Sequence, residues 1–235
     1  MTDNNQSDPS DLCKNETQEL IKLFEGLDTA GVSDALDKMN LHGQALGIMP
    51  LKNYTLAIVG AAYTVKYIPV GTPAGTVGDY IDDVEEGDIV VIDNNGRLDC
   101  TVWGDILTQY AGIRKIAGTV IDGVCRDVNK AIEDQYPIFS SGRFMRTGKD
   151  RVEVESVNQT VNIGTVRVEP RDIVVADANG VVIVPRKFAR QIAKIAHEIE
   201  TVETAIRKRI MMGDSISEAR EKLNYHTLQR KLNDE

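Results

Sequence analysis

The sequence predicts a single mixed α/β domain with helical segments at both ends. Apolar segments with strand character alternate with helix-like segments in the first half of the chain, whereas apolar residues recur with a period of two from Arg151 to Val184. From Lys187 to Met212 they recur at helical spacing. Strands that alternate with helices and then follow one another directly favour a layered domain with a mixed sheet over an all-parallel sheet. A chain of 235 residues with 42% hydrophobic residues can bury one sizeable core without a second domain.

The chain opens on a polar, acidic segment, and residues 1–12 are predicted to be a disordered tail. The segment has no positively charged start and no apolar run, so neither a signal peptide nor a membrane span is expected. The first helix is expected to be capped at Asn15, with Gln18 three residues further on, and to stop near Gly26.

A second short helix is expected to open at Thr29 or Ser33 and to continue through Met39, because both residue types cap helices well. The Ser33-Asp34 pair is interpreted as part of this cap. The alternative, in which the pair approaches a functional site, stays open.

The middle of the chain contains two predicted strands, Leu56–Lys66 and Asp88–Ile92. The Gly-, Pro- and Thr-rich segment between them is interpreted as a turn that leads into a helix near Thr76–Ile81, and a phosphate-binding role for its glycines is less favoured. Two similar segments, Asp88–Gly96 and Asp172–Gly180, each predict a buried strand that ends in an Asn-Gly turn.

The C-terminal third is expected to be helical. Pro185 is suited to precede the long helix from Lys187 to Met212, Gly213 is expected to end it, and Ser215 or Ser217 can cap a further short helix. The predicted organisation is therefore a tail, an α/β domain and a C-terminal helical extension, at residues 1–12, 13–212 and 213–235.

Charge and cysteine content narrow the class of protein. The net charge of −9 disfavours a nucleic-acid binder, which would need a surplus of Lys and Arg to contact phosphates. Three cysteines without metal-ligand spacing suit a reducing compartment, so a cytoplasmic location is expected. The three histidines lie in separate segments and predict neither a zinc site nor a histidine-based nucleophilic mechanism.

The most informative segment runs from Trp103 to Asp127. A helix-like run, Ile106–Lys115, and a short apolar strand, Gly118–Ile121, separate two clusters that therefore lie at the ends of regular elements. The first cluster is the Gly-Asp turn at Trp103–Leu107, and the second contains Arg126 and Asp127. An arginine presents a planar fork of donors to a carboxylate, and an aspartate is a hard oxygen ligand for a cation such as Mg²⁺. In the alternative interpretation, Arg126 and Asp127 have no site function and only pair with other surface charges.

Gly104-Asp105-Ile106-Leu107, followed by Gly123-Val124-Cys125-Arg126-Asp127, resembles the signature of the RraA-like family. The resemblance extends over roughly residues 25 to 190. Some members of the family are class II pyruvate aldolases, namely 4-hydroxy-4-methyl-2-oxoglutarate aldolases that also decarboxylate oxaloacetate. The resemblance implies a swivelling β/β/α-type fold and a homotrimer or homohexamer.

The resemblance also implies roles for individual residues. The backbone amides of Gly104, Asp105, Ile106 and Leu107 would bind the pyruvyl carboxylate, and Arg126 would contact the substrate. Asp127 would hold Mg²⁺ or Mn²⁺, and Asp105 would act through a metal-bound water. The chain departs from the aldolase pattern three positions after Asp127, where Lys130 replaces an acidic residue.

The expected function is a divalent-metal-dependent lyase that cleaves 4-hydroxy-2-oxo acids to pyruvate, or decarboxylates oxaloacetate, through a metal-stabilised pyruvate enolate. The expected partner is thus a small 2-oxo acid, and no nucleic acid or membrane. The alternative is a non-catalytic RraA-type regulator that binds an endoribonuclease or another protein. An aldolase or epimerase that acts on sugar acids by related metal chemistry stays open.

Overall fold

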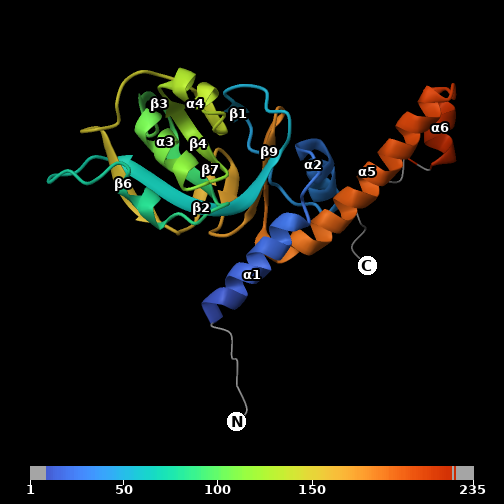
Figure 1. Ribbon diagram of the computed structural model, residues 1–235, viewed down its shortest axis with the longest axis horizontal. Helices are drawn as coiled ribbons and strands as arrows, with labels where there is room; N and C mark the ends of the chain where they lie inside the picture. The colour runs from blue at the N-terminus through green and yellow to red at the C-terminus, as the bar shows by residue number, and fades with distance from the viewer. Residues whose placement is uncertain (1–8, 224, 226–235) are drawn as a thin grey trace, which may run out of the picture.

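The computed structural model describes residues 9–223 and residue 225, and it has a mixed sheet at its centre (Figure 1). The strand order is β1-β5-β4-β3-β2-β9-β10, with β6 paired to β2, and a separate two-stranded sheet joins β7 to β8. The pairs β2–β3, β3–β4 and β4–β5 are parallel, whereas β2–β6, β2–β9 and β9–β10 are antiparallel. The predicted mixed α/β fold with helices at both ends is confirmed.

The strands are β1 (Met49–Pro50), β2 (Ile58–Pro69), β3 (Ile89–Thr101), β4 (Gly118–Cys125), β5 (Ile138–Arg143), β6 (Val152–Val157), β7 (Val161–Ile163), β8 (Val166–Val168), β9 (Ile173–Asp177) and β10 (Gly180–Val184). The helices are α1 (Pro9–Lys22), α2 (Thr29–Lys38), α3 (Asp105–Ile113), α4 (Val128–Glu133), α5 (Ala189–Met211) and α6 (Ile216–Lys222), and two 3-10 helices are η1 (Asp79–Asp83) and η2 (Arg186–Phe188).

The central strands are buried on both faces, which explains their continuous apolar sequence. In β3, Val90 and Ile92 pack with α3 and α4 on one face, while Ile89 and Val91 pack with β7 and β8 on the other. This is the alternation that a strand imposes on successive side chains. A third apolar cluster joins α1, α2 and α5 to β9 and β10. The sheet is therefore covered on both sides.

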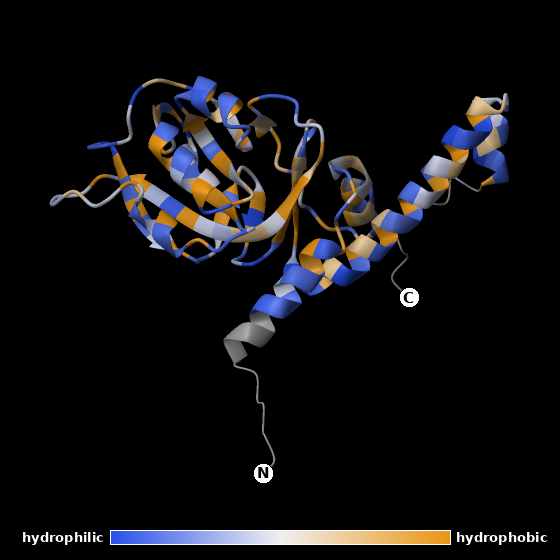
Figure 2. Ribbon diagram, in the orientation of Figure 1, coloured by the Kyte–Doolittle hydropathy of each residue, from blue (hydrophilic) through white to orange (hydrophobic). Residues whose placement is uncertain are grey.

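Helix α5 is the longest helix, with 23 residues (Figure 1). Its apolar residues lie on one side along the first half, where they pack against the domain, and Figure 2 shows the alternation of apolar and polar positions along it. Its second half projects away from the sheet and carries α6. Within residues 9–223, no helix combines the length and the apolar character that a membrane crossing requires.

The predicted start of the first helix is wrong, whereas α2 begins at Thr29, one of its two predicted starts, but with a different capping residue. Helix α1 runs through Asn15 instead of starting there, and α2 is capped by Asp28, whose Oδ1 accepts a hydrogen bond of 2.8 Å from Gly31 N. The amide and hydroxyl of Thr29 bind the carboxylate of Asp177 instead, at 2.9 and 2.7 Å. Ser33 lies inside α2, where its hydroxyl accepts a hydrogen bond from Gln44, so its interpretation as a cap is also wrong.

The two Asn-Gly steps have different outcomes. A tight turn joins β9 to β10, as predicted, but its two residues are Ala178 and Asn179, and Gly180 pairs with Asp177 as the first residue of β10. Asn95-Gly96 does not end its strand: both residues have positive φ, 53° and 64°, but β3 continues to Thr101. Its pairing with β4 shifts register between Asp93 and Arg97, so the step is a bulge within a long strand.

Other segments agree with expectation to different degrees. The predicted helix near Thr76–Ile81 is instead the short 3-10 helix η1, which starts at Asp79. Gly213 ends α5 with φ of 102°, and Ser215 caps α6 in a capping box with Glu218. The predicted tail lies outside the described residues as far as position 8, as does most of the chain after residue 223.

Asp88, immediately before β3, is a buried carboxylate that pairs with Arg171 at 2.6 Å. Burial raises the pKa of Asp88 from 3.8 to about 6, although Arg171 opposes the rise. A carboxyl whose pKa is higher in the folded state stabilises that state at low pH. This contribution is lost as the pH rises from about 4 to about 6.

We therefore predict that wild type loses roughly 2 to 3 kcal/mol of unfolding free energy relative to Asp88→Asn between pH 4 and pH 7. Urea unfolding of both proteins across this range measures the difference, and the comparison cancels the titration of all other groups. A difference that is constant, or that changes in favour of wild type as the pH rises, would contradict the prediction.

Candidate functional site

The two clusters predicted from the sequence meet at the carboxyl ends of β3 and β4. Strand β4 ends at Cys125, so Arg126 and Asp127 follow it directly, and α3 begins at Asp105 after β3 has ended. Arg126 N donates a hydrogen bond of 3.0 Å to Trp103 O, and Asp105 N donates one of 3.3 Å to Asp127 Oδ2. In open α/β sheets this edge is the usual place for a ligand site.

The carboxylate of Asp127 lies against the backbone of Gly104. A Cβ atom at Gly104 would lie 2.9 Å from Asp127 Oδ2 and 3.3 Å from Arg126 Nε, so a larger residue would displace both side chains. Asp127 itself has left-handed backbone angles, φ 56° and ψ 34°, which aspartate tolerates better than most residues. Arg126 Nε pairs with Asp127 Oδ2 at 3.2 Å, and both side chains are partly exposed.

Contacts of Trp103 and Thr108 fix the loop that carries Gly104. The indole of Trp103 is buried, stacks on Tyr136 with a centroid distance of 6.0 Å, and donates a hydrogen bond of 3.0 Å to the Thr108 hydroxyl. The Thr108 hydroxyl in turn donates to Gly104 O at 2.9 Å. The hydroxyl of Thr101 bonds to both the amide and the carbonyl of Trp103. These contacts fix the backbone that faces the site.

The first turn of α3 binds carboxylate oxygens. Asp105 N donates to Asp127, as above, and Ile106 N donates a hydrogen bond of 2.9 Å to Asp105 Oδ1. Unpaired amides and the helix dipole make such a turn a favourable place for an anion. A substrate carboxylate could therefore replace the protein's own carboxylates at these amides.

Arg126 separates two hollows. One, of about 240 Å³, is lined by Val77, Gly78, Thr101, Val102, Trp103, Gly104, Asp105, Ile106, Leu107, Arg126, Thr147 and Gly148. The other, of about 290 Å³, is lined by Cys125, Arg126, Asp127, Val128, Arg143, Phe144 and Met145.

The far walls of these hollows come from the loop before η1 and the loop between β5 and β6, and neither loop was predicted to reach the site. Residue 148 must be a glycine for this approach, because a Cβ atom there would lie 2.4 Å from Thr101 O. The glycine lets the second loop pack on the end of β3, where Thr101 N donates a hydrogen bond of 2.9 Å to Arg146 O.

Three further observations concern residues around the site. Cys125 packs inward, and burial raises the pKa of its thiol, so a thiolate is disfavoured. Lys130, on α4, pairs with Asp134 at 2.7 Å, and this hydrogen bond raises the pKa of Lys130. The Ser33-Asp34 pair lines neither hollow.

The donor set suits a cation that needs few protein ligands. Within the described part of the chain, no three His, Cys, Asp or Glu side chains cluster as a metal site. The carboxylate of Asp127 is exposed, with that of Asp105 on the adjoining turn. Mg²⁺ and Mn²⁺ accept hard oxygen ligands, and Mg²⁺ commonly keeps several waters and binds through one or two carboxylates together with its substrate. These residues therefore fit such an ion.

Comparison with known proteins agrees with this architecture. The family model described as RraA-like, Aldolase/RraA, matches residues 29–183, which include both clusters of the site. The chain belongs to this family.

Two relatives illustrate the range of named members. Protein DlpA of Legionella pneumophila is 38% identical over 219 residues, which are 92% of this chain but only 35% of that protein. The chain thus spans about a third of that relative. A protein of Halalkalibacterium halodurans, named "Putative 4-hydroxy-4-methyl-2-oxoglutarate aldolase", is 32% identical over 168 residues, 72% of this chain and 77% of that protein.

The fold is also found in solved structures. An uncharacterized protein from Pseudomonas syringae pv. tomato has a TM-score of 0.80 and 40% sequence identity, over 86% of this chain and 97% of that chain. The comparisons therefore show the family and the fold. They support aldolase activity for the family as a whole.

The close approach at Gly104 yields a prediction with a matched control in the same helix region. A Cβ atom added at Gly112, in α3, would have no atom within 4 Å apart from its chain neighbours and its own helix backbone, so Gly112→Ala should raise the unfolding free energy by roughly 0.5 to 1 kcal/mol. Gly104→Ala should give no such gain, because its methyl group meets Asp127 and Arg126. Chemical denaturation measures both. Equal stabilisation by the two substitutions would contradict the close approach at Gly104.

Proposed function

We propose that the protein is a divalent-metal-dependent lyase that cleaves 4-hydroxy-2-oxo acids to pyruvate and can also decarboxylate oxaloacetate. The observation that carries the proposal is the juxtaposition of a carboxylate-binding helix turn, an arginine and an exposed aspartate within one site. Membership of the Aldolase/RraA family and the similarity to a relative named as an aldolase support it.

The first step is to bind the pyruvyl end of the substrate. Its carboxylate would take the place of protein carboxylates at the amides of Asp105 and Ile106, within the turn Gly104–Leu107. Arg126, which lines both hollows, would direct its guanidinium to the 2-oxo group or the carboxylate. Preorganised donors of this kind typically contribute about 3 kcal/mol each to the stabilisation of a developing oxyanion.

Asp127 would hold Mg²⁺ or Mn²⁺, and Asp105 would lie beside the water ligands of the ion. When bound, the ion supplies Lewis acidity toward the carboxylate and keto oxygens of the substrate. Asp105 would accept the proton of the 4-hydroxyl group through a water molecule. The bond between carbons 3 and 4 then breaks: carbon 4 becomes the carbonyl carbon of the second product, and the electron pair of the broken bond passes toward the 2-oxo group. The proton taken up by Asp105 returns through water to carbon 3, which gives pyruvate.

Oxaloacetate fits the same arrangement, because loss of carbon dioxide leaves its electron pair on the same carbon. Arg126 and the α3 turn would therefore serve both reactions. No separate site is needed for the second activity.

We predict that Asp127→Asn lowers kcat/KM for pyruvate release at least 100-fold, and that Arg126→Lys lowers it at least tenfold, because lysine cannot supply the planar fork. The matched control is Asp134→Asn, which removes an acidic side chain that pairs with Lys130 and lines neither hollow, and it should leave kcat/KM unchanged. A coupled pyruvate assay with saturating Mg²⁺, with and without a chelator, measures all four proteins. Equal rates in wild type, Asp127→Asn and chelated samples would exclude the metal-dependent mechanism.

A second candidate function is a non-catalytic protein-binding regulator. The observation in its favour is a pair of large apolar side chains at the site, Ile106 and Met145, which are 79% and 75% exposed. Exposed apolar groups of this size suit a protein partner. Wild type that releases no pyruvate from either substrate class with Mg²⁺ or Mn²⁺ would favour this candidate.

A further inference from the structure

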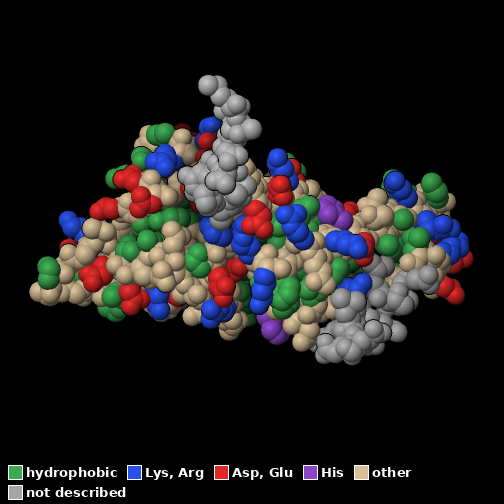
Figure 3. Space-filling model, turned by 90° about the horizontal axis from the view of Figure 1, so that it is seen from below, with side chains coloured by type: hydrophobic (Ala, Val, Ile, Leu, Met, Phe, Trp, Pro, Cys, Tyr) green, Lys and Arg blue, Asp and Glu red, His purple; other side chains and the backbone are tan. Residues whose placement is uncertain are grey.

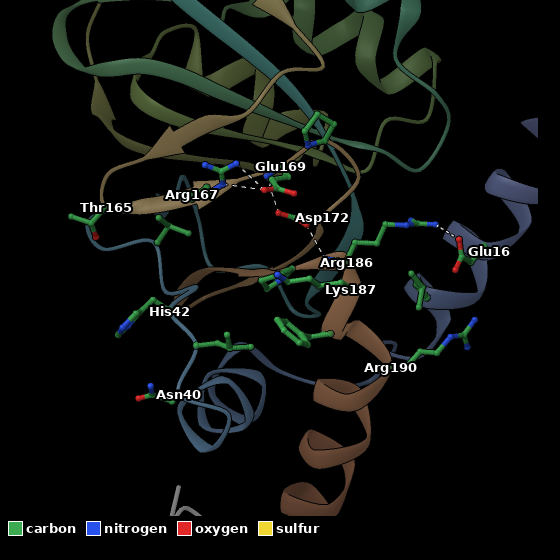
Figure 4. Close-up of a pocket in the computed structure, with 16 residues that line it drawn as sticks. Glu16, Asn40, His42, Thr165, Arg167, Glu169, Asp172, Arg186, Lys187 and Arg190 are labelled. Carbon is green, nitrogen blue, oxygen red and sulfur yellow. Dashed lines mark hydrogen bonds and ion pairs between the residues drawn. The ribbon is translucent and has the colours of Figure 1, made fainter. Parts of the chain in front are cut away.

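A second cavity lies where α1 meets the start of α5 (Figure 4). Its volume is about 790 Å³, compared with about 240 and 290 Å³ for the hollows beside Arg126. Its walls come from α1, the segment after α2, the segment from β8 to β9, and η2 with the first turn of α5. It shares no lining residue with the proposed catalytic site, so it requires a separate explanation.

The cavity is unusual in its charge. Four basic side chains line it, against three acidic ones, in a chain whose net charge is −9. Viewed from below Figure 1, the molecule shows basic side chains gathered near the middle of the face, interspersed with acidic ones (Figure 3). The basic lining residues are Arg167, Arg186, Lys187 and Arg190, and the acidic ones are Glu16, Glu169 and Asp172.

Each of the three carboxylates already has partners. Glu16 pairs with Arg186 at 2.7 Å, and Glu169 pairs with Arg167 at 2.9 Å. Asp172 is buried and accepts hydrogen bonds of 2.8 Å from the backbone amides of Glu169 and Arg186. The three acidic side chains of the wall are therefore paired with residues of β8 and η2, and these contacts stabilise the wall.

Lys187 differs from the other basic residues of the cavity, because it makes no ion pair with any residue that the structure describes. Its Nζ atom lies 4.9 Å from the centre of the Phe188 ring, a cation–π contact that leaves its hydrogen-bond donors available. Beside it the wall is apolar, with Leu41, Val166 and Phe188. The cavity thus offers a cation next to an apolar surface.

Arg186 can add a second donor. Its Nη2 atom pairs with Glu16, whose side chain is 55% exposed, and its Nη1 atom donates a hydrogen bond of 3.0 Å to the Thr17 hydroxyl. Solvent screens an exposed ion pair of this kind, so the pair contributes little. A ligand anion that accepts two hydrogen bonds from the guanidinium can compete with such a pair. Arg190 is similarly held by the exposed Glu19 of α1, at 3.0 Å.

We propose that this cavity is a second ligand site that binds a small organic anion. The anionic group would lie at Lys187 and within reach of Arg186, and the apolar body of the ligand would pack against Leu41, Val166 and Phe188. The chemistry suits a phosphoryl or a carboxylate group on an apolar or aromatic body. The site is independent of the proposed lyase activity.

The probe for the test is 8-anilinonaphthalene-1-sulfonate, an aromatic anion whose fluorescence rises on binding. We expect saturable binding to the full chain, weakened at least fivefold by Lys187→Ala and largely restored by Lys187→Arg. Lys194→Ala is the matched control, because Lys194 is an exposed lysine of α5 outside the cavity wall, and it should leave binding unchanged. Circular dichroism of each variant confirms that it is folded.

Binding that is absent, or that Lys187→Ala and Lys194→Ala weaken equally, would overturn the proposal. Competition then identifies the ligand group: displacement of the probe by inorganic phosphate indicates a phosphoryl ligand, and displacement by benzoate indicates a carboxylate ligand. Displacement by neither would also overturn the proposal. Asp127→Asn should bind the probe as wild type does, which separates this result from the fate of the proposed lyase activity.

Discussion

The site depends on the contact between the carboxylate of Asp127 and the backbone at the start of α3. Asp127 follows β4 and Asp105 opens the helix after β3, so this contact joins two segments that are 22 residues apart in the chain. It is possible because residue 104 has no side chain, and a Cβ atom there would lie 2.9 Å from the carboxylate. The buried support of Trp103 and Thr108 keeps the helix turn in place.

Sequence patterning predicts that both clusters lie at the ends of regular elements, but it predicts neither this contact nor its surroundings. Helix α3 and strand β4 follow from local apolar patterning, and parallel strands bring their carboxyl ends to one edge of a sheet. By contrast, Asn95-Gly96 carries the usual signal for a tight turn, yet pairing with β4 keeps β3 extended as far as Thr101. Tertiary pairing overrides the local signal there. Local reasoning also cannot show that Gly148 packs on Thr101 O, because the two are far apart in sequence.

The helix caps show a similar limit. Asp28, Thr29 and Ser33 are all good capping residues, so composition alone does not choose among them. The choice falls on Asp28 because the polar groups of Thr29 bind Asp177, near the end of β9. A residue that is distant in the sequence therefore decides where α2 is capped, and the same contact ties α2 to the sheet.

The central claim is that Asp127 holds a divalent ion together with a 2-oxo acid. Isothermal titration calorimetry with Mg²⁺, in the presence of oxalate as an analogue of the pyruvate enolate, tests it without any need to know the natural substrate. Saturable binding in wild type, lost in Asp127→Asn and absent without oxalate, is the predicted result. Binding that is equally strong in wild type and Asp127→Asn, or no binding in wild type, would contradict the claim.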